Sequence, residues 1–544
     1  MSRHETERLL FLPRPSRENS RDTRQSGSYF SLGLRGGDVE VRDRGGNQTS
    51  PTDFEPVPRD PQAKWCNSAP PWRRHLGPSP PPQSEGESGQ RTAVCSLPMH
   101  NQLRTAVAQD TERIRDELEA MVRIPSVSAD GYDPAEVRRS AEFVAELLES
   151  SGLDDVHLLE IDGAHPAVYG TKQGPEGAPT VLLYAHHDVQ PPGPADQWET
   201  APFEPFERDG RLYGRGSADD KAGIAMHLGS IRALQDDLPV TIKVFIEGEE
   251  EIGSAHLIEF LDTYRELLTS DAIIIGDAGN WRIGVPGLTT SLRGLVDCIV
   301  TVRTMTYAVH SGSFGGTYPD AITALAWTLS KLHNEDGSVA VEGLLSGDTD
   351  PLDLTEEELD EQMLPVDGLH LMGTGTLTSR LWRKPSISVI AIEAVPLSEA
   401  INQLVPEARA KVSMRIAPGQ DAAAAFEALR AHIERSAPWG AQVTVTEGTT
   451  GEAFDLDTGG EMYEAYRQGM REGYGVEPVE MGMGGSIPFV AAFQERYPDA
   501  AVLLVGIADP MSRYHGPNES LELADLESAT IAQAIALTTL GRPS

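Results

Sequence analysis

Histidine and carboxylate side chains follow four short apolar runs of this sequence. They are His186 and Asp188 after residues 180–185, Glu250 and Glu251 after 240–246, Asp277 after 272–276, and His515 in the loop after 501–506. In open α/β sheets, ligands bind beyond the carboxyl ends of the strands. If the four runs are strands of one sheet, these side chains meet at one of its edges.

The residue types in this set indicate a metal site. Histidine together with several carboxylates suits a hydrolytic metal such as zinc or manganese. The chain has only three cysteines, so a metal must be held by His, Asp and Glu. Asp219 and Asp220 add carboxylates at the start of an expected helix, where the helix dipole favours anions. The whole set of histidines and carboxylates has one carboxylate too many for a single tetrahedral ion, which suggests two ions.

The elements that carry these residues predict an α/β fold. The four apolar runs are nearly continuous in Val, Ile and Leu, which is typical of strands buried on both faces. Residues 105–122 and 136–148 carry apolar side chains at helical spacing. We therefore expect a catalytic domain built on a mostly parallel sheet, with helices on both faces.

A second domain is expected between Asp277 and His515. These residues are 238 positions apart (515 − 277), which is far longer than any loop in a compact domain. The order of apolar strands and helices in this stretch favours an inserted α+β domain of the ferredoxin-like type. Its acidic stretch 346–367 is predicted to be an exposed excursion.

The first 98 residues differ in composition from the rest. They hold 14 Lys and Arg against 12 Asp and Glu, and 13 of the 39 prolines of the chain. Such a segment cannot bury enough apolar surface to offset its ordering entropy, so we expect disorder. Met99 precedes the first helical pattern, and either it is the true start or the segment is a genuine flexible tail. The expected organisation is 1–98 disordered, 99–292 and 451–544 catalytic, and 293–450 inserted.

Charge and hydropathy exclude several classes of function. The net charge of −38 over 544 residues opposes binding to nucleic acids and to anionic membrane surfaces. No stretch approaches the roughly 20 consecutive apolar residues of a membrane helix, and no signal peptide is recognisable. The sequence therefore predicts a soluble, cytoplasmic protein.

Several motifs, in order, resemble one enzyme family. They are YAHHDVQPPGPADQWETAPFEP, DGRLYGRGSADDKAG, EGEEEIGS, GGSIP and the loop with His515. The sequence resembles the co-catalytic metallopeptidases, which include cytosolic non-specific dipeptidases, carnosinases, glutamate carboxypeptidases and aminoacylases. The resemblance covers roughly residues 105–540, and it implies that the inserted domain acts as a lid and in dimerisation. DVQP, EGEEEIGS and HSGSFGG are most similar to the dipeptidase and carnosinase branch.

The resemblance implies a role for each residue of the site. His186 and Asp277 would hold one ion, Glu251 and His515 the other, and Asp219 would bridge them. Glu250 would be the general base that activates a bridging hydroxide, and Asp188 would fix the imidazole of His186. A cis peptide bond is implied between Asp219 and Asp220. Zinc is the expected metal, with manganese or cobalt as alternatives.

Three further residues match substrate contacts of the family. His310 would stabilise the oxyanion from the partner subunit of a homodimer, Arg415 would clamp the substrate carboxylate, and Ser486 would bind near the same end. The family often has Asp two residues before this histidine, where Ala308 stands here. This departure from the family pattern concerns the orientation of the His310 side chain.

The sequence thus predicts a metal-dependent dipeptidase that acts on small peptides. An N-acyl amino acid deacylase of the same family is the alternative. A catalytically silent binding protein on the same fold is disfavoured, because Glu250 and all five ligand positions are present. His187 is expected to have no role in the chemistry, His227 is expected to be structural or at the surface, and Lys221 is expected to pair with an acidic neighbour.

Overall fold

The computed structural model describes residues 90–235, 238–485 and 488–541. Most of the amino-terminal segment, for which disorder was expected, lies outside these residues. The first described element is helix α1 (Gln90–Val122), so the expected boundary at residue 98 falls inside a helix. Whether Met99 is the natural start remains a prediction.

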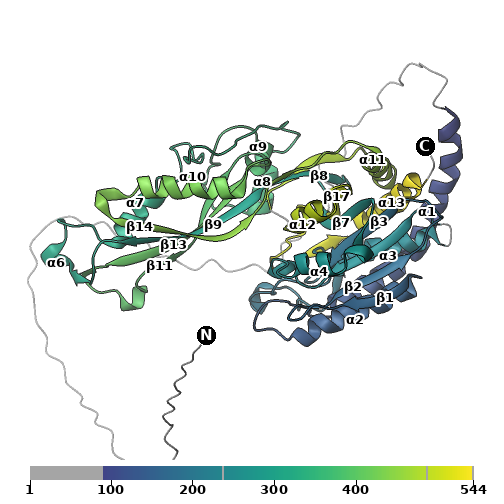
Figure 1. Ribbon diagram of the computed structural model, residues 1–544, viewed down its shortest axis with the longest axis horizontal. Coiled ribbons are helices and arrows are strands. Elements are labelled where there is room, and N and C mark those ends of the chain that lie inside the picture. The colour runs from purple at the N-terminus through teal and green to yellow at the C-terminus, as the bar shows by residue number, and fades with distance from the viewer. Residues whose placement is uncertain (1–89, 236–237, 486–487, 542–544) are drawn as a thin grey trace, which may run out of the picture. The chain divides into compact units, whose positions relative to one another are not determined.

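A nine-stranded sheet forms the centre of the catalytic domain (Figure 1). Its strand order is β1-β2-β6-β3-β7-β17-β8-β15, and β16 also pairs with β8. The bounds are β1 (Asp154–Leu159), β2 (Ala167–Lys172), β3 (Thr180–His186), β6 (Thr241–Glu247), β7 (Ala272–Gly279), β8 (Gly287–Leu292), β15 (Phe454–Asp455), β16 (Val479–Met483) and β17 (Ala501–Ala508).

The four apolar runs of the sequence are the central strands β6, β3, β7 and β17. They are mutually parallel, with Val181 opposite both Ile242 and Ala272, and Ala501 also opposite Ala272. The pairs β1/β2, β2/β6, β17/β8 and β8/β15 are antiparallel. The expected mostly parallel sheet is therefore confirmed for its centre, and the carboxyl ends of the four strands share one edge.

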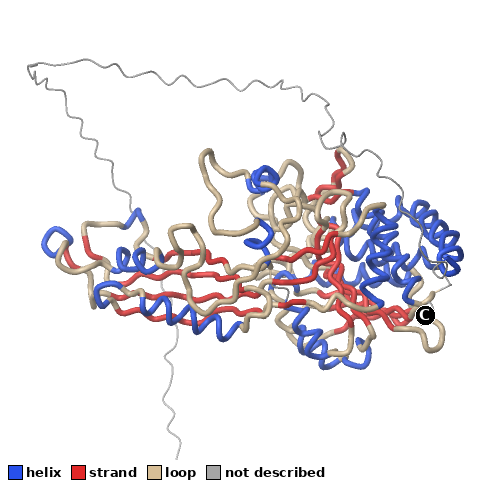
Figure 2. Tube along the Cα trace, turned by 90° about the horizontal axis from the view of Figure 1, so that it is seen from above, coloured by secondary structure: helices blue, strands red, loops and turns tan. Residues whose placement is uncertain are grey.

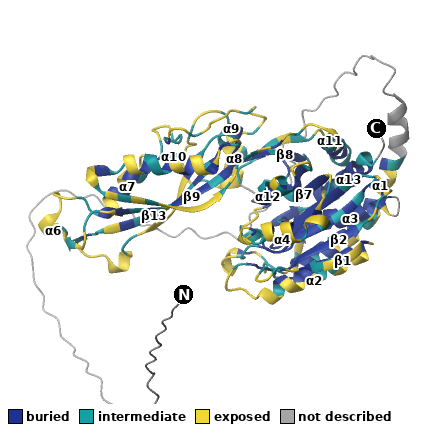
Figure 3. Ribbon diagram, in the orientation of Figure 1, coloured by how far each residue is buried: buried dark blue, intermediate teal, exposed yellow. Residues whose placement is uncertain are grey.

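Helices cover both faces of this sheet, as the buried central strands require (Figures 2 and 3). One apolar core packs α1, α2, α3, α11 and α13 against the sheet, and the other packs α4, α5 and α12. The remaining bounds are α2 (Pro134–Ser150), α3 (Lys221–Leu234), α4 (Leu257–Thr263), α5 (Arg265–Leu268), α11 (Glu461–Tyr474), α12 (Pro488–Arg496) and α13 (Leu523–Leu540).

The inserted segment forms a separate antiparallel sheet in the order β11-β13-β9-β14. Along the chain its elements are β9 (Gly294–Arg303), α7 (Ala321–Leu329), β11 (Ser386–Glu393), β13 (Glu407–Ile416), α10 (Ala422–Arg435) and β14 (Gln442–Gly451). This βαββαβ order with a 4-1-3-2 sheet is the ferredoxin-like arrangement, as expected. Helices α7 and α10 cover an apolar core on one face of the sheet.

The other elements are short. Two helices, α8 (Glu356–Met363) and α9 (Leu377–Trp382), lie in an excursion, residues 346–383, between α7 and β11. The rest are β4 (Phe206–Arg208), β5 (Arg211–Tyr213), β10 (Val309–His310), α6 (Ser311–Phe314), β12 (Gln403–Leu404), β18 (Ser520–Glu522), η2 (Ala195–Gln197), η3 (Glu250–Ile252), η4 (Leu397–Glu399) and η5 (Pro438–Gly440). No helix in the described part of the chain has the length and apolar content to cross a membrane.

Candidate active site

The predicted metal ligands come from five separate places at the carboxyl edge of the central sheet. His186 ends β3, Asp277 lies in β7, and Glu251 lies in the 3₁₀ turn that follows β6. Asp219 lies two residues before α3, and His515 lies in the loop after β17. The parallel order of these strands brings residues together that are up to 329 positions apart (515 − 186).

Asp219 joins two groups of side chains through its two carboxylate oxygens. Its Oδ1 lies 3.0 Å from Nε2 of His186, which is also 3.9 Å from Oδ2 of Asp277. Its Oδ2 lies 3.1 Å from Nε2 of His515, which is also 3.1 Å from Oε2 of Glu251. The two groups are those that the resemblance implied for two ions, with Asp219 between them. The peptide bond between Asp219 and Asp220 is cis, as also implied.

Buried Asp188 positions the residues around it. Its Oδ1 accepts the backbone N–H of Glu250 at 3.2 Å, and its Oδ2 accepts that of Glu251 at 3.1 Å and the hydroxyl of Ser128 at 2.6 Å. Nδ1 of His186 lies 3.4 Å from the same carboxylate. Burial raises the pKa of Asp188, but the bonds from His186 and Ser128 outweigh burial and hold the pKa below its usual value. Nδ1 of His186 also lies 3.1 Å from the backbone carbonyl oxygen of Asp188, so this one residue fixes both the imidazole and the two adjacent glutamates.

The electrostatics of the cluster fit a pair of cations. Burial, followed by the charges of Glu251 and Asp219, raises the pKa of Glu250 to about 8. Burial and the charge of Asp219 raise the pKa of Asp277 well above its usual value. Hydrogen bonds to Asp219 and Glu251 raise the pKa of His515 to about 10. Four crowded carboxylates with two imidazoles form a donor set that zinc or manganese accepts, and positive charge would relieve their repulsion.

Glu519 is a site residue that the sequence analysis missed. Its buried carboxylate accepts the backbone N–H groups of Gly216, Ala218 and Asp219 at 3.1, 3.0 and 3.1 Å, and it pairs with Nη1 of Arg215 at 2.5 Å. It therefore holds the loop that presents Asp219. Its only sequence signal is its position four residues after His515.

Lys221 does not pair with an acidic neighbour, so that expectation was wrong. Its buried Nζ donates to the backbone carbonyl groups of Met121 and Ile124, at 2.9 Å each. Burial lowers its pKa to about 7. Two carbonyl groups at the end of α1 satisfy the ammonium group, which here ties helix α3 to the end of α1.

His187 and His227, which were expected to lie outside the chemistry, are buried and hydrogen-bonded. Nε2 of His187 lies 2.9 Å from the carbonyl oxygen of Pro166. Nε2 of His227 lies 3.0 Å from the carbonyl oxygen of Tyr184, and its Nδ1 contacts the side chain of Gln533. Burial lowers the pKa of each histidine to about 4, so both are neutral at pH 7.

A cavity of about 410 Å³ opens onto the cluster. Asp219, Glu250, Asp277 and His515 line it. Its size lies within the range of about 300–1,000 Å³ that is usual for small-molecule sites. Arg293 also lines this cavity. The sequence analysis missed Arg293 as well, because its contacts are with segments far away in the sequence, such as Arg380 and Gly484.

The predicted substrate residues are placed differently. His310 is exposed in β10 and its Nδ1 accepts the backbone N–H of Gly312 at 3.1 Å. Arg415 is partly buried in β13, opposite Leu295 and Ser386. Neither residue is among the described residues that line the cavity of its own chain. Ser486 lies outside the described residues.

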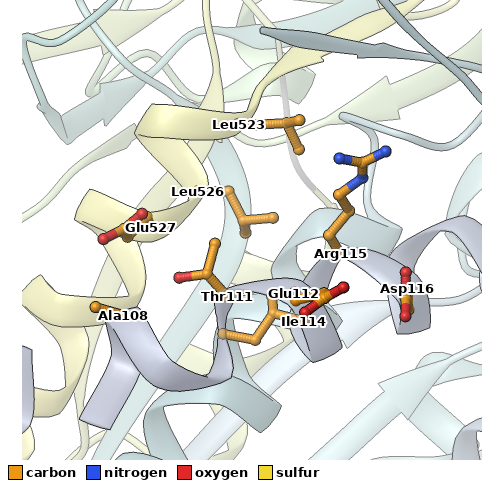
Figure 4. A pocket seen from close by; sticks show the side chains of 9 residues that line it. All are labelled: Ala108, Thr111, Glu112, Ile114, Arg115, Asp116, Leu523, Leu526 and Glu527. Atoms are coloured by element: carbon orange, nitrogen blue, oxygen red, sulfur yellow. The ribbon is translucent and has the colours of Figure 1, made fainter. Parts of the chain in front are cut away.

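A second hollow, of about 550 Å³, lies between α1 and α13 (Figure 4). Its lining includes Glu112, Arg115 and Asp116 from α1 and Leu523 and Glu527 from α13. None of the predicted metal ligands or described substrate residues is among the residues that line this hollow. The candidate active site is therefore the cavity at the edge of the sheet.

Comparison with known families decides the class of this protein. The sequence model described as "Peptidase family M20/M25/M40" matches residues 182–538, well over half of the chain. The protein belongs to this family. The matched range contains both histidines and all the carboxylates of the cluster, and it confirms the resemblance to metallopeptidases.

Named relatives and solved structures agree with this assignment. A Corynebacterium striatum protein named cysteinylglycine-S-conjugate dipeptidase is 36% identical over 440 residues, covering 79% of this chain and 96% of that protein. Human Beta-Ala-His dipeptidase is 29% identical over 437 residues, covering 76% of this chain and 83% of that protein. The crystal structure of human carnosine dipeptidase 1 has the same fold, with a TM-score of 0.70, 24% identity, and coverage of 81% of this chain and 99% of that one.

Proposed function

We propose that this M20 metallopeptidase hydrolyses dipeptides at the cavity beside Asp219. The observation that carries the proposal is the geometry of Asp219, whose two oxygens reach two separate His and carboxylate groups while Glu250 lines the same cavity. The two relatives reported above, of which 96% and 83% are covered, are named dipeptidases.

Two divalent ions would be held by the five ligands, one by His186 and Asp277, the other by Glu251 and His515, with Asp219 shared. Bound there, the ions would polarise the scissile carbonyl and lower the pKa of the attacking water. Zinc is the proposed metal because imidazole and carboxylate are both its usual ligands, and manganese or cobalt are alternatives. Metal analysis of the purified protein distinguishes them.

Glu250 would be the proton carrier of the reaction. Its carboxylate faces the cavity, and its backbone N–H is fixed by Asp188. It would take the proton of the attacking water and deliver it to the leaving amine nitrogen, so that it ends the cycle unprotonated. Asp188 would keep the orientation of both Glu250 and the imidazole of His186 constant during these transfers.

We also propose that two copies of the chain assemble through the inserted domain. His310 is exposed and does not line its own cavity, which supports a role in the site of a partner. Strand β11 is an edge strand with exposed apolar side chains: Val389 is 41%, Ile390 52% and Ile392 63% exposed. An unprotected apolar edge favours pairing with another chain. Arg415 would clamp the substrate carboxylate, and Ser486 would bind near the same end.

The test is Glu250→Gln, which keeps the shape of the side chain and removes its basicity. The variant should bind two metal ions per chain, as measured by elemental analysis, and lose turnover of dipeptides by about 10²- to 10⁴-fold. Near-normal turnover would refute the role of Glu250.

A substrate panel should include N-acetyl amino acids, because deacylation is the alternative within the family. The names of the relatives favour dipeptides. A cytoplasmic location is part of the proposal, and cell fractionation followed by immunoblotting tests it.

A further inference from the structure

The cavity beside Asp219 has an apolar wall as well as its cluster of carboxylates. The wall consists of Trp281, Leu354, Leu359, Leu381, Trp382 and Met481. Leu354, Leu359, Leu381 and Trp382 belong to the excursion 346–383 of the inserted segment. Residues 346–367 were expected to be exposed, and they largely are, but Leu354 and Leu359 turn towards the catalytic domain.

Ion pairs hold the excursion to the catalytic domain. Arg282, five residues after Asp277, reaches Oδ2 of Asp353 at 2.6 Å and Oε1 of Glu358 at 2.7 Å. Glu358 also closes a capping box with Thr355 at the start of α8. Because Leu354 and Leu359 directly follow Asp353 and Glu358, these bonds fix the position of the wall.

Two tryptophans join the wall to the segment just after strand β7, the strand that carries the predicted metal ligand Asp277. The rings of Trp281 and Trp382 meet edge-on, with centroids 5.8 Å apart and an interplanar angle of 68°. Nε1 of Trp281 lies 3.2 Å from Oδ1 of Asp353. Trp281 is four residues after Asp277, so the apolar wall starts close to the carboxylates.

Arg293 brings a positive charge to this side of the cavity, because its printed hydrogen-bond partners are neutral oxygen atoms. Its Nη1 donates to the carbonyl groups of Arg380 and Lys384 and to the hydroxyl of Ser386, and its Nε donates to the carbonyl group of Gly484. Burial, with a further contribution from the nearby positive charge of Arg415, lowers its pKa to about 10. Its hydrogen bonds join α9 to the glycine-rich segment, and the cavity therefore holds this fixed charge as well as the apolar side chains of the wall.

We propose that the wall accepts a large apolar or aromatic side chain of the dipeptide, so that the enzyme prefers such substrates to those with small side chains. The inference rests on the proposed dipeptidase function and names its substrate class. Contact with the wall would release water from the apolar surfaces of both the substrate and the cavity, while the peptide group lies at the carboxylates.

The experiment compares kcat/KM for a matched set of dipeptides on the metal-loaded enzyme. The set is Ala-Ala, Leu-Ala, Ala-Leu, Phe-Ala and Ala-Phe. The double variant Leu354→Ala/Leu381→Ala trims the wall at two partly exposed positions, so the fold should survive. Leu352→Ala is the matched control, because Leu352 lies in the same excursion, is 39% exposed and does not line the cavity.

We expect the wild type to prefer a Leu or Phe substrate to Ala-Ala. This preference should fall about tenfold in the double variant, with little change for Ala-Ala and none in the control. A wild type that prefers Ala-Ala, or a double variant with an unchanged preference, overturns the inference while leaving the dipeptidase function intact. A wild type that cleaves no dipeptide instead refutes the proposed function.

Discussion

Glu519→Gln should weaken both the fold and metal binding, because one carboxylate satisfies three backbone N–H groups and a buried guanidinium. The amide keeps the size of the side chain but replaces an acceptor oxygen with a donor. Each oxygen accepts two of the four contacts, so two contacts then become clashes of donors, and Arg215 loses its charged partner. Removing one partner of a buried ion pair typically costs about 3–5 kcal/mol.

The free energy of unfolding of Glu519→Gln should therefore fall by about 3–5 kcal/mol, measured by urea unfolding in EDTA. Because Glu519 holds the N–H of Asp219, affinity for the metal should also fall, by about 10- to 100-fold, in a titration with a chromophoric chelator. Glu522→Gln is the matched control, since Glu522 lies 3.5 Å from Arg211 and has no hydrogen bond to the Asp219 loop in the described structure. Its cost should stay below about 1 kcal/mol.

A loss below about 1 kcal/mol in Glu519→Gln, with unchanged metal affinity, would refute the reasoning. A double-mutant cycle with Arg215→Met separates the ion pair from the backbone bonds. The double variant should lose less free energy of unfolding than the sum of the losses of the two single variants. The reason is that the second substitution removes the charge that the first left unpaired.

Two more predictions concern the partner subunit and pH. If His310 acts in the site of a partner, the inactive variants His310→Ala and Glu250→Gln should regain about a quarter of wild-type activity when they are unfolded and refolded together. The reason is that half of the dimers are mixed, and each mixed dimer has one complete site. No recovery of activity would place His310 outside the partner's site. Burial holds the pKa of His227 at about 4 against 6.5 when exposed, so the unfolded state takes up the proton first and stability falls as pH drops from 6.5 to 4. Between pH 7 and pH 5, the free energy of unfolding of His227→Gln, measured in urea, should fall by about 2 kcal/mol less than that of the wild type. Equal falls in the two proteins would contradict a neutral, buried His227.

The ligand cluster was predictable because its signals are local. His186, Asp277 and His515 each follow an apolar run whose composition indicates a buried strand, and parallel strands present their carboxyl ends at one edge. The chain order βαββαβ was readable for the same reason, since each element carries its own periodicity. The strand order within the sheets was not readable, because pairing is decided by contacts between distant segments.

The supporting residues were not predictable in this way. Glu519 acts through backbone N–H groups about 300 positions earlier in the chain, and backbone groups leave no trace in a sequence. Lys221 lies beside two aspartates, yet the end of α1 supplies its partners. Acidic composition suggested that the excursion was solvent-exposed, but the ion pairs of Arg282 bring its leucines to the cavity.

The place of β17 in the sheet has a consequence for the order of folding. This strand lies between β7 and β8, yet it begins at Ala501, 222 positions after β7 ends at Gly279 (501 − 279). On the ribosome the inserted domain is therefore complete while the hydrogen-bonding groups of β7 on that side still have no partner. A nascent chain that stops short of residue 508 carries an open, apolar strand edge, which is a site for aggregation or for chaperone capture.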